Sequence, residues 1–213
     1  MRFRNVAGFC TVFALLLTLP ALASAQAASA TSYGVKAGLN ISSVNVDFGD
    51  ASITGDGRAG FLFGGWVARD FNPRFGIQVE GLFSQKGTEF ADEDNLFDVP
   101  GDASFKLSYV EFPVLARVNF PASAATVRVL AGPTFGFNVN ESIKVGDVEL
   151  DGDDVPLKAF EAGFALGGAV EFRKFIVDAR YTWGLTDIND GTGTDEPTVK
   201  NGTFSISFGY RFR

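Results

Sequence analysis

Hydrophobic and polar residues alternate with a period of two in eight separate runs along the chain. In the last run, large apolar residues occupy every second position from Phe204 to Phe212, and Thr, Ser, Gly and Arg occupy the positions between them. Successive side chains of a β-strand point to opposite faces, so this alternation is typical of strands with one apolar face. The predicted strands are 33–41, 60–67, 75–86, 110–120, 127–139, 160–172, 175–186 and 203–212.

The connections between these runs alternate in length. The short turns are 70–74, 121–125 and 173–174, and the long polar loops are 43–57, 88–104, 141–156 and 187–201. An up-and-down barrel places all short turns at one rim and all long loops at the other. A run of about ten residues also fits a tilted strand that crosses a bilayer. We therefore expect one all-β domain, an eight-stranded antiparallel up-and-down transmembrane β-barrel with short periplasmic turns and long acidic extracellular loops.

Three positions disturb the pattern. Pro113 and Pro133 fall inside predicted strands, and because a proline cannot donate a ladder hydrogen bond, each predicts a β-bulge. The apolar phase also slips near Tyr109 and Val110. The simplest interpretation of that slip is a strand or register assignment that is wrong by one residue.

The apolar face of such a barrel can point inward or outward, and side-chain volume distinguishes the two. Eight strands enclose a space just wide enough to be filled by side chains. The apolar face carries most of the Phe residues, whereas most strand glycines lie on the polar face. The crowded interior should be the glycine-rich face, with the apolar side chains in lipid. The expected lipid-facing residues include Phe164, Tyr181, Trp183, Phe204, Phe208, Tyr210 and Phe212.

Charged residues of the polar face would then lie in the barrel interior. They are Lys36, Glu80, Lys86, Glu111, Arg117, Arg128, Glu161, Glu171, Asp178, Arg180 and Arg211. Unpaired charges are costly in a confined space, so we expect a structural ion-pair network. The alternatives are a lining for a narrow ion path and acid–base chemistry, for example by Glu111 with Glu161, although their spacing does not demand it.

The first 25 residues have the features of a secretory signal peptide. Arg2 and Arg4 precede an apolar run, and Ala23-Ser24-Ala25 forms a small-residue cleavage pattern. We expect residues 1–25 to be removed and residues 26–213 to form the barrel domain. Removal of the two arginines takes the formal net charge from −7 to −9, which argues against nucleic acid as a partner.

The chain contains no His, and its single Cys lies within the predicted signal peptide. A Ser-His triad, a Cys nucleophile, a thiolate zinc site and disulfides are therefore excluded from the mature chain. We predict that the protein is not an enzyme and uses no cofactor.

Acidic residues are concentrated in the long loops. Nineteen of the 25 acidic residues fall there, whereas the short turns are basic, with Arg69, Arg74, Arg173, Lys174 and Arg213 at or beside them. Asp151, Asp153 and Asp154 are weak candidates for calcium ligands, because they lack the spacing and the bidentate Glu of a helix-loop-helix calcium site. A solvated acidic surface that recruits divalent ions beside lipopolysaccharide is the preferred interpretation.

Three segments together resemble the PorT-like family of bacterial outer-membrane β-barrels. They are 109–117 (YVEFPVLAR), 131–136 (AGPTFG) and 178–185 (DARYTWGL). The resemblance implies an eight-stranded outer-membrane barrel and carries over no catalytic residue. One departure is Arg213, which follows Phe212 where such barrels usually end on an aromatic residue.

The resulting hypothesis is a monomeric outer-membrane barrel with a filled, ion-paired interior. Its role would be structural, adhesive or partner-docking, and it would act through its loops on lipopolysaccharide, divalent cations or a protein partner. Three alternatives stay open: a narrow ion or small-solute channel, a soluble periplasmic barrel that binds an apolar ligand, and a membrane-embedded hydrolase without a His base.

Overall fold

The alternating runs form one antiparallel β-sheet. The computed structural model describes residues 30–47, 52–54, 56–90, 103–145, 148–151, 158–186 and 198–213. In these residues the strands are β1 (Ala30–Asp47), β2 (Ser52–Thr54), β3 (Asp56–Asp70), β4 (Phe75–Phe90), β5 (Ala103–Pro121), β6 (Thr126–Val145), β7 (Val148–Asp151), β8 (Phe160–Phe172), β9 (Phe175–Gly184) and β10 (Thr198–Arg211).

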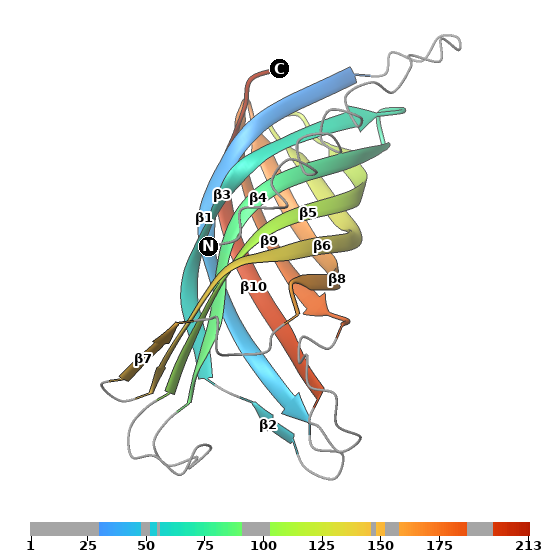
Figure 1. Cartoon of the computed structure of the whole chain (residues 1–213). Coiled ribbons are helices and arrows are strands. Elements are labelled where there is room, and N and C mark those ends of the chain that lie inside the picture. The colour runs from blue at the N-terminus through green and yellow to red at the C-terminus, as the bar shows by residue number, and fades with distance from the viewer. Residues whose placement is uncertain are drawn as a thin grey trace, which may run out of the picture.

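The sheet closes on itself into a barrel (Figure 1). Around the barrel the order is β1, β3, β4, β5, β6, β8, β9 and β10, and β10 pairs with β1 from Gly34–Arg211 to Asp47–Thr198. The short strands β2 and β7 pair only with the ends of β1 and β6. The predicted closed, eight-stranded antiparallel barrel is confirmed, with two short strands added at one rim.

All long connections leave and re-enter the sheet at one rim, which we call the loop rim. The two-residue connection 173–174 and the four-residue connections 71–74 and 122–125 lie at the opposite rim, the turn rim, where β10 also ends. Figure 1 shows the turn rim at the top and β2 and β7 at the loop rim below.

The strands run further than the sequence pattern predicts. β1 continues to Asp47, β4 to Phe90 and β6 to Val145, so the expected loops 43–57, 88–104 and 141–156 begin too early. Polar residues continue the backbone ladder, for example in the pairs Ser104–Lys144 and Asn45–Lys200. Hydrophobic alternation ends where one face of a strand no longer contacts an apolar environment. Backbone hydrogen bonds between strands do not require that contact and continue further.

Burial alternates along each strand with the polar face inward. Leu39, Phe164 and Phe208 are exposed on the outer surface, while Lys36 and Arg180 are buried. Glycine permits close backbone approach on the inner face, since a Cβ on Gly64 would meet the carbonyl oxygen of Gly81. A soluble barrel with an apolar interior requires the opposite orientation, so that alternative is wrong.

The predicted bulges at the two prolines are wrong. The pairs Pro113–Thr134 and Ala116–Ala131 lie on either side of an interrupted stretch and keep one register, and Pro133 pairs in register with Phe164 of β8. Each proline removes a single donor, which the ladder tolerates without an extra residue.

The register irregularity of β5 and β6 lies instead between Ser108 and Tyr109. The assignment of β5 itself is not displaced, because Leu107, Tyr109, Leu115 and Arg117 are all buried and share one parity. The apolar residues change from one parity to the other near Tyr109 because Leu107 and Tyr109, which are apolar, lie on the inward face.

Among the described residues, no helix is long and apolar enough to cross a membrane. The predicted signal peptide, residues 1–25, lies outside the described residues.

Candidate functional site: an ion-paired barrel interior

Charged side chains of the interior form three clusters along the barrel axis. The central cluster joins Lys36 on β1, Glu80 on β4, and Asp178 and Arg180 on β9. Lys36 Nζ lies 2.9 Å from Glu80 Oε2 and 4.0 Å from Asp178 Oδ2. Two cations and two carboxylates balance each other, so the central cluster is formally neutral.

Arg180 makes the contacts that cross the interior. Its Nη1 and Nη2 donate to Glu80 Oε2 and Oε1 at 3.1 and 3.0 Å, and its Nε and Nη2 donate to Asp178 at 2.8 and 2.6 Å. β4 and β9 are four strands apart in the ring of eight, so this bidentate pair links opposite walls. Paired guanidinium–carboxylate contacts of this kind are strong and geometrically specific.

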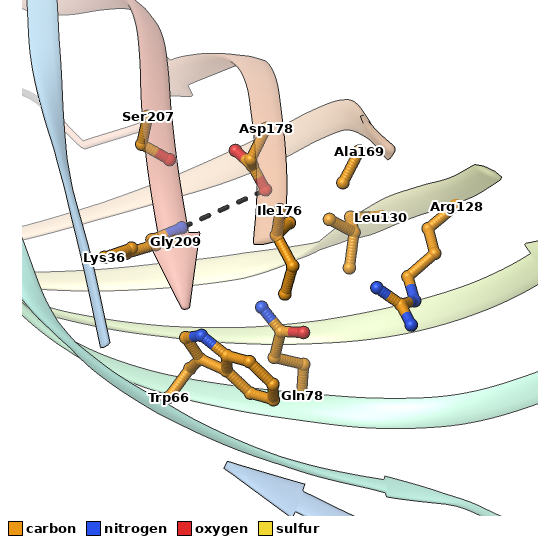
Figure 2. Close-up of a pocket in the computed structure, with 10 residues that line it drawn as sticks. All are labelled: Lys36, Trp66, Gln78, Arg128, Leu130, Ala169, Ile176, Asp178, Ser207 and Gly209. Atoms are coloured by element: carbon orange, nitrogen blue, oxygen red, sulfur yellow. Dashed lines mark ion pairs between the residues drawn. The ribbon is translucent and has the colours of Figure 1, made fainter. Parts of the chain in front are cut away.

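Two small cavities lie beside the central cluster. Figure 2 shows one cavity, with Lys36 and Asp178 joined on one side and the Arg128 side chain on the other. This cavity has a volume of about 10 Å³ for water centres, and a neighbouring one that reaches Glu111 and Arg180 has about 20 Å³. These volumes leave room for about one or two water molecules each.

The loop-side cluster is formed by Lys86, Glu111 and Glu161. Lys86 Nζ lies 2.7 Å from Glu111 Oε1 and 3.4 Å from Glu161 Oε2, and 5.0 Å from the centre of the Tyr109 ring. Asn201 donates to Glu161 at 3.3 Å. Two carboxylates face one ammonium group, so the loop-side cluster is formally negative.

The turn-side cluster has the opposite balance. Glu171 accepts ion pairs from Arg128 and, at 2.8 Å, from Arg211. Arg117 Nε lies 3.8 Å from Asp70 Oδ1. Asn119 links the two pairs, because it donates to Asp70 at 3.0 Å and accepts from Arg128 Nε at 3.1 Å. Three guanidinium groups and two carboxylates leave excess positive charge at this end.

All eleven charged residues assigned to the interior from the sequence take part in an ion pair, and the structure distributes them over these three clusters. Sequence reasoning missed Asp70, Tyr109, Asn119 and Asn201 as members, and also Gln78, whose Nε2 donates to Glu80 Oε1. Parity could have found several of them, since Asp70 shares its face with Trp66 and Ala68, and Asn119 with Arg117.

A small apolar core also lies inside the barrel. Leu115, Leu130, Ala165 and Ala169 form a buried cluster against which Ile176 packs. These residues lie on the polar face of their strands, so alternation alone does not show that they form a core.

The outer surface carries aromatic residues in two zones with aliphatic residues between them. On β9, Phe175 lies near the turn rim, Val177 in the middle, and Tyr181 and Trp183 toward the loop rim. On β10 and just after it, Phe212, Tyr210 and Phe208 follow from the turn rim, then Ile206, and then Phe204 toward the loop rim. We call these zones the turn-side and loop-side girdles. Two aromatic girdles that flank an apolar band are typical of transmembrane β-barrels.

The seven residues expected to face lipid lie on this outer surface. Six of them are exposed, namely Phe164, Tyr181, Trp183, Phe204, Phe208 and Phe212. Tyr210 is half-buried because its ring packs against Phe175 and Phe212, each at 5.5 Å between ring centres.

The candidate calcium ligands are not part of the described interior. Asp151 is the last residue of β7, and Asp153 and Asp154 lie outside the described residues. Within the described part of the chain, no group of three or more Asp, Glu, His or Cys side chains is placed to hold a metal ion.

Residues 24–190 match a family model described as outer membrane protein beta-barrel domain. The chain belongs to this family. This outer-membrane barrel therefore resides in the bacterial outer membrane, with its aromatic girdles and aliphatic band in contact with lipid. Its sequence has no significant match among curated proteins.

Several solved outer-membrane proteins are similar to the barrel in fold. OprG from Pseudomonas aeruginosa is 14% identical with a TM-score of 0.50, covering 87% of this chain and 97% of OprG. Neisserial surface protein A is 14% identical with a TM-score of 0.48, covering 85% and 98%. Ail, the attachment invasion locus protein of Yersinia pestis, is 18% identical with a TM-score of 0.47, covering 85% and 98%. At these identities the likeness concerns the fold alone.

The aliphatic band predicts a depth-dependent cost of charge on the outer-membrane barrel. Ile206→Arg places a cation in the middle of the band and should lower the free energy of unfolding by about 2–4 kcal/mol. Phe212→Arg, on the same strand in the turn-side girdle, should cost about 0–1 kcal/mol. Urea unfolding of both variants in lipid vesicles measures the difference, and equal costs would contradict the assignment of the band.

The central cluster predicts a second stability effect. Glu80→Gln removes one of two buried carboxylates that face Lys36 and Arg180, and should lower the free energy of unfolding by about 3–5 kcal/mol. Adding Lys36→Met restores charge balance and should recover part of the loss. Glu111→Gln is the matched control, with a smaller effect because Lys86 keeps Glu161. If the double variant were no more stable than Glu80→Gln, charge balance would not be the cause.

Proposed function

We propose that the protein is a non-conducting, monomeric outer-membrane barrel that presents an acidic surface outside the cell and docks partners there. The observation that carries this proposal is the contact of Arg180 with Glu80 across the interior. It joins opposite walls of the barrel, and Lys36 and Asp178 occupy the space beside it. Because these side chains fill the lumen, we infer that the protein acts through the surfaces at its two rims.

A continuous ion path would need either a water-filled lumen or a gap in the central cluster. The two described cavities beside the cluster have room for about one or two water molecules each. Opening a path would require separation of a buried charge pair, which is strongly unfavourable. These features favour docking over the channel alternative.

The lengths of the connections favour a loop rim that faces outside the cell, and the sequence makes this rim acidic. Small outer-membrane barrels have short periplasmic turns and longer extracellular loops. Nineteen of the 25 acidic residues lie in the long connections as first assigned from the sequence. We infer that these acids hold divalent cations, which bridge to the anionic groups of lipopolysaccharide, and that the same surface accepts a cationic protein partner.

Within the family, we infer a relationship to PorT-like members. The segments 109–117, 131–136 and 178–185 support it. The first and third segments combine an interior charged residue with outer residues, for example Arg117 with Ala116 and Arg180 with Tyr181. The proposal includes cleavage of residues 1–25 as a signal peptide, which leaves the barrel domain 26–213.

The filled lumen predicts an absence of conductance. Pure wild-type protein in planar bilayers should give no discrete current steps. The variant Glu80→Ala with Arg180→Ala removes the contact between opposite walls and serves as the comparison, because the space it opens should admit water and ions. Discrete steps from the wild-type protein would favour the channel alternative.

The acidic loop surface predicts contacts outside the cell. A photo-crosslinking residue at Asp94 or Asp195 should capture lipopolysaccharide in intact cells, and chelation of divalent cations should abolish the adduct. The double variant D92N/E93Q, combined with the crosslinker at position 94, should weaken capture from the first of these loops. A crosslinker at Asn72 in a short turn is the control, and capture of lipopolysaccharide from Asn72 instead would reverse the proposed orientation.

A further inference from the structure

The turn between β8 and β9 is both basic and strained. It consists of Arg173 and Lys174, and Arg173 has a positive φ of 57°, the one such non-glycine residue in the described part of the chain. Two-residue hairpin turns favour Asn and Gly, which adopt this conformation at low cost. Two adjacent cations at such a position are unfavourable for the turn itself, which points to a use for their side chains.

Both side chains of the turn lie against the turn-side girdle. The Arg173 guanidinium lies 5.3 Å from the centre of the Phe172 ring, and Lys174 Nζ lies 5.9 Å from the centre of the Tyr210 ring. Phe172 is exposed on the outer surface, and Tyr210 packs there between Phe175 and Phe212. Because aromatic girdles mark the boundary between lipid and water, the two cations are held at the depth of the headgroups.

Arg211 adds a third cation beside the turn. Its Nη2 donates to the Arg173 carbonyl at 3.2 Å and pairs with Glu171 at 2.8 Å. About a third of the Arg211 side chain is exposed, although its Nε atom is itself buried. Glu171 is buried and also pairs with Arg128, so it does not neutralise the turn.

The surroundings supply no further counter-charge. No acidic side chain described at the turn rim is exposed, and Asp70, which is half-buried, lies on β3 in contact with Asn119 and Arg117. Arg173 and Lys174 thus lie over the outer-surface rings, and the partly exposed Arg211 lies beside them and pairs with Glu171. Guanidinium and ammonium groups in this arrangement suit a phosphate group.

An apolar surface lies directly below these cations. The rings of Phe175, Phe208, Tyr210 and Phe212 contact one another in series, with centres 5.5–5.6 Å apart. A ligand that fits both features carries a phosphate and long apolar chains. We propose that Arg173, Lys174 and Arg211 bind the phosphate of an anionic phospholipid headgroup, whose acyl chains lie along this part of the turn-side girdle.

The turn itself offers a variant that should fold. R173N/K174G removes both cations and places Asn, which tolerates a positive φ, at position 173. Urea unfolding is measured in vesicles of phosphatidylcholine and in vesicles of an equal mixture with phosphatidylglycerol. The anionic vesicles should raise the folding equilibrium constant of the wild-type protein, roughly fivefold for each cation engaged. R173N/K174G should lose this gain while it folds at least as well in phosphatidylcholine.

A matched control separates a site from the general charge of the rim. R69Q/R74Q removes two exposed cations from the turn between β3 and β4 at the same rim, and it should keep most of the gain. Native mass spectrometry of detergent-purified protein loaded with phosphatidylglycerol should show a retained lipid on the wild type and on R69Q/R74Q. The proposal is overturned if both double variants lose the gain equally, or if R173N/K174G retains the lipid as the wild type does.

Discussion

Closure of the sheet is the constraint on which the rest of this structure depends. Lipid offers no hydrogen-bond partners, so a sheet can cross a membrane only if it has no open edge. The pairing of β10 with β1 removes that edge and fixes the interior of the eight-stranded ring. Apolar side chains must then face outward, and the charged side chains of the same strands must find partners within a narrow space.

The interior meets this demand through ion pairs that are graded along the axis. The central cluster is neutral, the loop-side cluster is negative and the turn-side cluster is positive. The connections repeat this polarity, because the long ones are acidic and the short turns are basic. The barrel is therefore electrostatically asymmetric from one rim to the other, which suits a protein that meets different surroundings at its two ends.

Much of the fold was predictable because a strand has a period of two. Alternation identified the eight barrel strands and the residues that share a face, and side-chain volume gave the orientation that places the eleven charged residues inside. Alternation failed where the polarity of a side chain does not match the face or the strand on which it lies. Leu107 and Tyr109 are apolar yet point inward, and the strand ends of β1, β4 and β6 are polar yet remain paired. The period reports burial on one side and does not report backbone pairing.

The sequence by itself determined which side chains share a face, since parity along a strand is a local property of the backbone. It also determined the charge of the two rims through the composition of long and short connections. Only the tertiary structure decided which charges meet. Glu80 and Arg180 are 100 residues apart and pair because β4 and β9 stand opposite each other in a ring of eight strands. The contact of these two residues depends on closure of the sheet and on strand register, which no local sequence pattern encodes.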